Sequence, residues 1–173
     1  APMTQVSEAM NAASDERSSG SVPIVQNEQK RAEALARFKK DKEQAEEVLA
    51  GTQILAGTAL TAAEMLKLAK RLAARKSIGL ARRVLKRARS IVLNADEDRL
   101  EIFQKSALYT YKDPDLPLDW RLSEAFKILE AGDVLAKTES QESLGIAGAI
   151  YKRKWEADGI RRNLERALFY YLR

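Results

Sequence analysis

The chain has 173 residues, of which 45% are hydrophobic and 32% charged, as in an ordinary globular protein of one domain rather than a disordered or fibrous chain. It holds no cysteine and no histidine, which excludes disulfides, thiolate nucleophiles, zinc sites built from these residues and any mechanism with imidazole as the general base. Lys and Arg exceed Asp and Glu by 30 to 25, a net charge of +5. The meaning of this modest excess depends on where the cations lie.

The sequence predicts neither a secretory signal within residues 1–20 nor a membrane span. Residues 1–20 lack a basic segment followed by an apolar run, as a signal peptide would require. The most apolar window, residues 48–68, includes Thr, Gln, Glu and Lys side chains that a lipid-exposed span would not tolerate. Together with the lack of cysteine, these features favour a cytoplasmic protein.

Residues 1–29 are predicted to form a flexible polar leader, because they are rich in Ser, Asn, Gln and Glu and show no sustained period. The helical domain then occupies residues 30–173. From about Asn27 to Ala50, apolar residues recur at helical spacing between charges of alternating sign, which indicates a helix that packs against the start of the remaining domain. We expect Gly51 to end this helix.

The next helix has the clearest start. Thr61 followed by Glu64 makes a capping box, so a helix begins near Thr61. Two amphipathic helices follow, with a turn at residues 76–79, and their apolar stripes are Met65, Leu68, Ala69 and Leu72, then Leu80, Val84, Leu85 and Ala88.

Four further helices are predicted, over residues 100–111 and 118–131, from a Thr138 or Ser140 cap to about Trp155, and over 163–173. The prolines of residues 113–117 separate the first two, and Gly159 precedes the last. No stretch alternates with the period of a strand. The fold class is therefore all-α, a set of stacked antiparallel helix pairs.

The motif Met65-x-x-Leu68-Ala69-x-x-Leu72, followed by Ala81-x-x-x-Leu85-x-x-Ala88, resembles a tetratricopeptide (TPR) helix pair. Its small residues let two helices approach closely, and its large ones fill the space between pairs. Leu144-x-x-Ala147-Gly148-x-x-Tyr151 repeats the first pattern. Insertions at residues 112–117 and 156–162 suggest degenerate repeats with lengthened turns. The array is expected to be incomplete at its C-terminal end, which would leave apolar surface to stack on a further domain or a second copy.

Residues 60–173 are similar to a narrower class, the TPR-like TRAF-binding domain of apoptosis signal-regulating kinases and its bacterial relatives. The resemblance rests on Gly148-Ala149-Ile150-Tyr151-Lys152 and on Glu165-Arg166-Ala167-Leu168-x-Tyr170-Tyr171. It implies a scaffold or regulatory module within a larger polypeptide or assembly. The chain has no kinase motif, and the partners of those kinases are not carried over.

Ten cations and no acid lie between Glu64 and Asp96. This basic patch over residues 67–89 could bind nucleic acid, an anionic membrane or an acidic protein segment. Alternatively, its members form the solvated faces of two helices and pair with acids of residues 43–47 or of another domain. The absence of interleaved aromatic residues argues against nucleic acid.

Candidate partner-binding residues are Lys67, Arg71 and Arg75, which share one helix face at four-residue spacing, and Trp120 and Trp155, which adjoin the expected long turns beside charged residues. The remaining aromatic residues of the second half are predicted to be core. Asp113, Asp115 and Asp119 have the spacing of hard-cation ligands but lack the glycine and distal glutamate of a calcium loop, so turn and cap roles are expected.

We expect no catalytic residue, no metal and no cofactor, because no motif arranges nucleophiles, acids or a phosphate loop. Gly145 and Gly148 at three-residue spacing suit close helix packing instead. The predicted function is therefore non-catalytic protein binding by a TPR-type scaffold or adaptor. The alternatives are electrostatic binding to nucleic acid or anionic membrane through the basic patch, and structural assembly by stacking.

Overall fold

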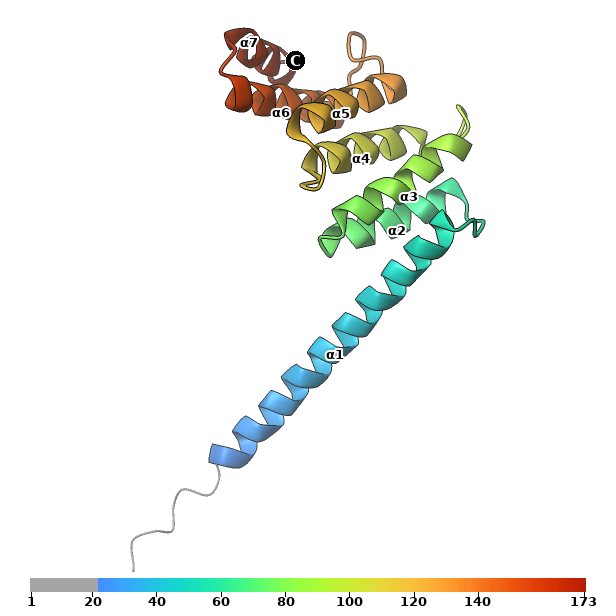
Figure 1. Cartoon of the computed structure of the whole chain (residues 1–173), viewed down its shortest axis with the longest axis vertical. Coiled ribbons are helices and arrows are strands. Elements are labelled where there is room, and N and C mark those ends of the chain that lie inside the picture. The colour runs from blue at the N-terminus through green and yellow to red at the C-terminus, as the bar shows by residue number, and fades with distance from the viewer. Residues whose placement is uncertain (1–21) are drawn as a thin grey trace, which may run out of the picture. The chain divides into compact units, whose positions relative to one another are not determined.

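The structure is a computed structural model that describes the backbone of residues 22–173 and the side chains from residue 28 onward. Within that part of the chain all regular structure is helical, which confirms the all-α class. The helices are α1 Val22–Leu55, α2 Ala62–Ala74, α3 Ile78–Ile91, α4 Arg99–Lys112, α5 Leu118–Gly132, α6 Gln141–Asp158 and α7 Arg161–Tyr171 (Figure 1).

The first helix starts earlier than expected. Most of the predicted leader, residues 1–21, lies outside the described residues, whereas residues 22–29 belong to α1. Pro23 does not prevent this because it lies in the first turn of α1. Backbone N–H groups of a first turn make no hydrogen bond within the helix, so the N–H that proline lacks is not missed. The boundary expected at residue 29 therefore falls inside a helix.

The end of α1 is also later than expected. Gly51 is buried inside the helix, and a Cβ at this position would lie 3.0 Å from the side chain of Leu80. The helix continues to Leu55 and is followed by Gly57, whose positive φ of 111° suits a residue without a Cβ. Gly51 thus permits close packing of α1, and Gly57 is the residue that follows the helix end.

The chain divides into two compact units within α1, after Glu43. In the first unit, the side chains of residues 28–43 are exposed, and Leu35 and Phe38 are among them. In the second unit, α1 packs through Ala50, Gly51 and Ile54. The helix expected from Asn27 to Ala50 was predicted to pack on the domain along its length. Within the second unit, the packing involves the last turns of α1.

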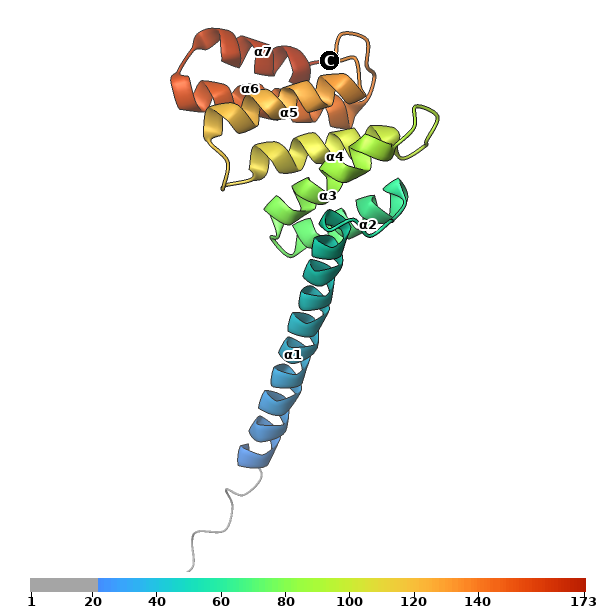
Figure 2. The ribbon, with the colours of Figure 1, turned by 45° about the vertical axis from the view of Figure 1, so that its right-hand side comes forward.

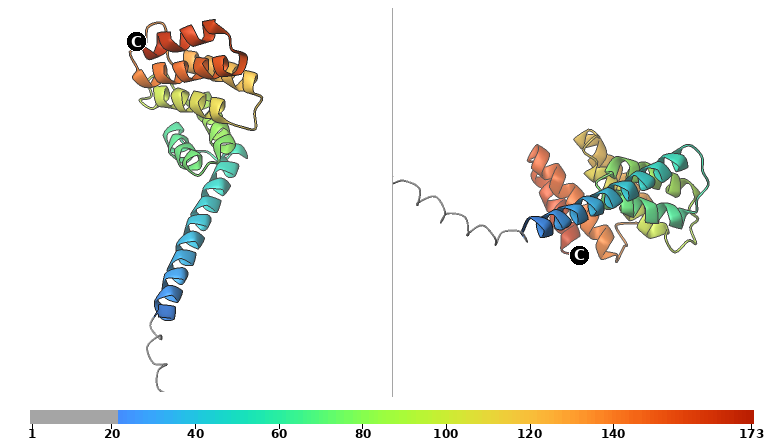
Figure 3. Two further views of the ribbon diagram at one scale, coloured as in Figure 1. Left: turned by 90° about the vertical axis from the view of Figure 1, so that its left-hand side faces the viewer. Right: turned by 90° about the horizontal axis from the view of Figure 1, so that it is seen from below.

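The second unit is a stack of three antiparallel helix pairs, α2 with α3, α4 with α5, and α6 with α7 (Figures 2 and 3). Successive pairs join through α3 against α4 and α5 against α6. Each pair has an apolar stripe that its own two helices cannot cover completely, so the neighbouring pair completes the core. This is the architecture of an α-solenoid.

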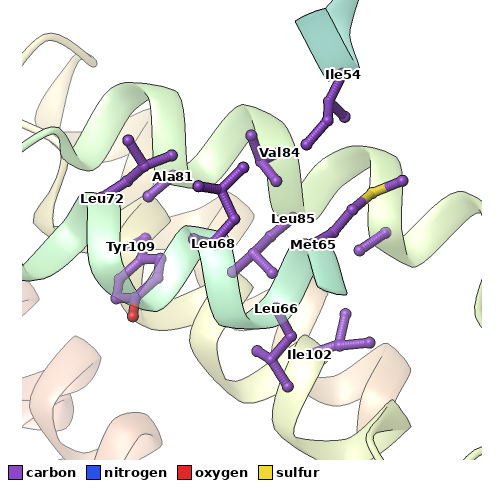
Figure 4. Packing of buried hydrophobic residues seen from close by; sticks show 12 residues of the cluster. Ile54, Met65, Leu66, Leu68, Leu72, Ala81, Val84, Leu85, Ile102 and Tyr109 are labelled. Atoms are coloured by element: carbon purple, nitrogen blue, oxygen red, sulfur yellow. The ribbon is translucent and has the colours of Figure 1, made fainter. Parts of the chain in front are cut away.

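The first core cluster confirms the predicted stripes. Ala69, Ala81 and Ala88 are completely buried, as close approach of α2 and α3 requires. Figure 4 shows Leu68 between Ala81 and Leu85, with Ile54 of α1 near Val84. The first pair, the end of α1 and residues of α4 thus share one core.

The predicted capping box of α2 is present. The Thr61 hydroxyl accepts a hydrogen bond from the backbone N–H of Glu64, and a Glu64 carboxylate oxygen accepts one from the Thr61 N–H. At the start of α6, Ser140 is the capping residue and accepts a hydrogen bond from the Ser143 N–H. Both local predictions of helix starts are therefore confirmed.

The expected long turn at residues 156–162 is wrong. Helix α6 runs on to Asp158, and only Gly159, at a φ of 67°, and Ile160 separate it from α7. The extra residues lengthen the helix because nothing before Gly159 breaks it, and glycine adopts the left-handed conformation that ends a helix at low cost. The turn between α4 and α5, at residues 113–117, is long as predicted.

The two glycines of α6 differ in their surroundings. A Cβ at Gly148 would lie 2.6 Å from the ring of Tyr171, so this glycine allows α7 to approach α6. No atom lies within 4 Å of the corresponding position at Gly145. The close-packing role predicted for both glycines is confirmed for Gly148, which lies on the face of α6 that α7 covers. The same prediction is wrong for Gly145, which lies away from that face.

Candidate functional site

Two of the predicted partner-binding cations form ion pairs within the chain. Arg71 of α2 and Arg75, which follows the end of α2, approach Glu47 of α1, with Nε to carboxylate-oxygen distances of 3.3 and 2.8 Å. A single carboxylate therefore neutralises part of the charge of this face and joins α1 to α2. Lys67, on the same face one turn earlier, is exposed.

Much of the basic patch of residues 67–89 is engaged in the same way. Lys70 pairs with Glu101 of α4, Arg83 donates to the Gly79 carbonyl, and Arg89 lies near Glu124. Burial lowers the pKa of Arg89, and Glu124 opposes that shift. These contacts favour the structural interpretation of the patch, with Lys86 and Arg87 among its exposed members.

Arg82 has a structural partner of its own. Its Nε donates to Oδ2 of Asp113 at 2.8 Å, and the Asp113 carboxylate is completely buried. The other oxygen of this carboxylate accepts a hydrogen bond from the Asp115 N–H. Asp113 thus has the turn role expected from the sequence and also joins the α4–α5 turn to α3, a link that spacing alone did not show.

Trp120 lies on α5 of the middle helix pair and Trp155 on α6 of the last pair, and neither helix packs on α2 (Figures 1 and 2). Trp120 is in the first turn of α5 and is half exposed, whereas Trp155 is partly buried. Asp119, the neighbour of Trp120, interacts electrostatically with Lys154, the neighbour of Trp155. The two indoles therefore occur on adjoining helix ends, and the cations of α2 do not adjoin them.

Lys154 has an unusual environment. Its ammonium lies 5.1 Å from the centre of the Tyr151 ring. Burial lowers the pKa of Lys154, the nearby Arg166 lowers it further, and Asp158 and Asp119 oppose the shift. A lysine in this position loses its proton more readily than an ordinary one.

A pocket of about 420 Å³ opens where the end of α4, the start of α5 and the end of α6 meet. Three cations border it, Lys112, Arg121 and Arg153, together with the single acid Glu156. Tyr111, Leu118, Leu122 and Ala157 supply the apolar and aromatic part of its wall. We name this cavity the basic pocket.

The guanidinium of Arg121 is held in place from one side. Its Nη1 donates to the Asp113 carbonyl oxygen at 2.7 Å, and its Nε is buried without a hydrogen-bond partner. Arg153, which is mostly exposed, contacts Glu156 at 3.3 Å. The basic pocket therefore combines one anchored cation with more exposed ones at its edge.

Sequence reasoning missed the basic pocket. Its lining residues come from three helices, and no spacing within one helix links Tyr111, Arg121 and Glu156. A usable signal was the proline-containing turn at residues 113–117, because turns between helices often carry binding residues. Cations on both sides of that turn, Lys112 and Arg121, would have marked it as a candidate site.

No group of three or more acidic side chains in the described residues is placed to hold a metal ion. None of the described helices combines the length and apolarity needed to cross a membrane.

Stacked helix pairs with small residues at their closest approaches define a TPR-type helical-repeat protein. The model of the Tetratricopeptide Repeats-Sensor (TPR-S) family matches residues 77–173, more than half of the chain, and the chain belongs to that family. Comparison with curated proteins and with solved structures produced no match. The matched segment begins at the start of α3 and includes the basic pocket and both tryptophans.

Proposed function

We propose that this chain is a non-catalytic protein-interaction module, a scaffold or regulatory adaptor that works within a larger polypeptide or assembly. The observation that carries the proposal is the stack of three helix pairs in a chain of the TPR-S family. Repeat arrays of this kind expose an extended surface suited to peptides and protein faces. That the chain is not an enzyme stays a prediction.

The surface around Trp120 and Trp155 is the better of the two candidate contact surfaces. A half-exposed indole such as that of Trp120 contributes large apolar area at an interface, and the charged neighbours Asp119 and Lys154 can form a polar rim around it. Trp155 on the adjoining helix end extends this surface.

The α2 face is the second candidate. Its role requires an acidic partner segment to engage Lys67 and to compete with Glu47 for Arg71 and Arg75. The Arg71 side chain is more than half exposed, so an acidic partner can recruit it from Glu47 at low cost. Recruiting Arg75 costs more, because it would leave the largely buried Glu47 carboxylate without its nearest cation.

The similarity of residues 60–173 to the TRAF-binding domain of apoptosis signal-regulating kinases agrees with a regulatory role but does not identify the partner. A cytoplasmic location likewise stays a prediction. We do not propose that the basic patch binds nucleic acid or a membrane, because several of its cations have acidic or carbonyl partners in the chain.

Affinity capture from lysate of the source cells, with and without nuclease, tests the proposed function. The bait is compared with a Trp120→Ala variant and with a Lys67→Glu, Arg71→Glu, Arg75→Glu variant. We expect discrete proteins to survive nuclease and at least one of them to be lost with one of the two variants. A triple Arg83→Glu, Lys86→Glu, Arg87→Glu variant is the matched control for charge, since all three side chains are exposed on α3.

Two results would count against the proposal. Recovery that disappears with nuclease would indicate electrostatic binding of nucleic acid instead. Recovery that is equally lost in the α3 control would show that overall charge, rather than a particular surface, governs the interaction.

A further inference from the structure

The basic pocket has the size of a small-molecule site. Its volume of about 420 Å³ falls within the range of ligand pockets in proteins. Leu118 and Leu122 from α5 and Ala157 from α6 form apolar wall, and Tyr111 adds an aromatic ring. Charged side chains supply as much of the wall as apolar ones do, so the pocket is more polar than a usual ligand site and suits a charged ligand.

The charges around the pocket point to an anion. Lys112, Arg121 and Arg153 border it against one carboxylate, that of Glu156, which leaves two positive charges in excess. Glu156 is also shared, because Lys152 approaches it at 3.8 Å while Arg153 contacts it at 3.3 Å. The acid therefore neutralises only part of the charge at the edge of the pocket.

Arg121 is prepared to bind an oxyanion. Its hydrogen bond to the Asp113 carbonyl oxygen restricts the guanidinium before any ligand arrives, so less side-chain entropy is lost on binding. A guanidinium is a planar fork that matches carboxylate and phosphate oxygens. Its Nε, buried without a partner, is an orphaned donor in the residue that lines the pocket.

Two further donors line the same pocket. Tyr111 is protonated at neutral pH like any tyrosine, and burial raises the pKa of its hydroxyl further. Lys112 follows it at the end of α4, with Nζ 5.9 Å from the centre of the Tyr111 ring. A bound oxyanion would thus meet donors from both α4 and α5.

We propose that the basic pocket binds a small molecule through a phosphate or carboxylate group, with Arg121 as the principal contact and with Lys112 and Arg153 at the edge. The shared chemistry is a compact oxyanion attached to a body small enough to lie against Tyr111 and Leu118. This would give the module a small-molecule ligand in addition to a protein partner, and the site lies entirely within residues 111–157.

The test is an NMR titration of the full chain at constant ionic strength, with inorganic pyrophosphate in one arm and citrate in the other. Sodium chloride added to the same ionic strength is the reference. We expect saturable shifts of the Tyr111, Lys112 and Arg121 amide resonances in at least one arm. The stronger arm identifies the phosphate or the carboxylate source.

Arg153→Gln and Lys112→Gln are the informative variants, because both side chains are exposed and neither anchors the fold. Each is expected to weaken binding about tenfold, as the loss of one charge-assisted hydrogen bond does. Lys86→Gln and Arg87→Gln remove the same charge from α3 and should leave the affinity unchanged. The titration of an Arg121→Gln variant is interpreted once the NMR spectrum of that variant shows a folded chain.

The proposal is overturned if neither anion, at concentrations up to about 10 mM, shifts these resonances more than sodium chloride does. A dissociation constant above about 10 mM would be too weak for a specific site. It is equally overturned if the α3 control variants weaken binding as much as the pocket variants do, since the effect would then be general electrostatic attraction.

Discussion

Arg82 of α3 donates through Nε to Oδ2 of Asp113 at 2.8 Å, and this joins residues 31 positions apart in the chain. The carboxylate is completely buried, while the Arg82 side chain keeps about a fifth of its surface exposed. The pair fixes the turn between α4 and α5 against the first helix pair. The same turn holds Arg121 through the Asp113 carbonyl, so the pair supports the wall of the basic pocket.

Removing Arg82 should destabilise the fold. Arg82→Met keeps much of the side-chain length but leaves a buried carboxylate without its cation, a change that costs about 3 to 5 kcal/mol for a fully buried pair. Because Arg82 is partly exposed, we expect on the order of 2 kcal/mol in urea unfolding. Arg83→Met, one residue on and exposed, should cost less than about 0.5 kcal/mol. Equal losses in the two variants would show that the pair has no special role.

Gly132 should not tolerate a methyl group. A Cβ there would lie 2.2 Å from Cβ of Phe103, an atom that cannot move without its backbone. We expect Gly132→Ala to lower the free energy of unfolding by about 3 kcal/mol, the upper end for overpacking. Thermal unfolding followed by circular dichroism measures this.

Gly148→Ala is the informative comparison. Its Cβ would meet the ring of Tyr171 at 2.6 Å, but that ring is half exposed and lies near the end of α7, so it can rotate away. Alanine also favours a helix over glycine by about 1 kcal/mol. The net change should be within about 1 kcal/mol. A loss as large as that of Gly132→Ala would mean that α7 cannot adjust.

Stability should fall in alkaline solution. Burial is the main cause that raises the pKa of Tyr109, Tyr111 and Tyr170 above the ordinary value of 10.0. The unfolded chain releases these protons first, so the stabilising effect is complete below pH 10 and is lost as the pH rises through the folded-state pKa values. Absorbance titration at the phenolate band, run beside urea unfolding, measures both. Titration of all tyrosines as in a free peptide would contradict this prediction.

Lys154 should release its proton below the ordinary lysine pKa of 10.5. Burial and the neighbouring Arg166 both disfavour its charged form, so folding is more favourable once this amine is neutral. Between the lowered pKa and 10.5 the Lys154 contribution to stability therefore rises with pH, opposite in sign to that of the tyrosines. NMR titration of the isotopically methylated lysine amines measures its pKa. Removing the charge in an Arg166→Gln variant should move that pKa back toward 10.5.

Much of the fold could be predicted from the sequence because its signals are local. The capping box at Thr61 and Glu64 and the alanines that space α2 and α3 are read within a few residues and recur in the structure as expected. Errors arose where a local signal was overridden. Gly51 was expected to end a helix, but tertiary packing against Leu80 used its small size instead.

The candidate site was less predictable. That Arg71 and Arg75 face α1 was among the alternatives, yet the choice of Glu47 as their shared partner depends on how α1 meets α2. The basic pocket combines cations from three helices, and the spacing of residues along one helix cannot show that the ends of three helices converge.

The sequence by itself determined that the described chain would be helical, paired and TPR-like, because helical period, caps and small-residue steps act between residues a few positions apart. Only the tertiary structure decided which charges are neutralised, where glycine serves packing rather than termination, and that Lys112, Arg121 and Arg153 meet at one cavity. The physical reason is that burial and pairing of charge depend on distances in space. Arg82 and Asp113 are 31 positions apart, and no local pattern in the sequence indicates their 2.8 Å contact.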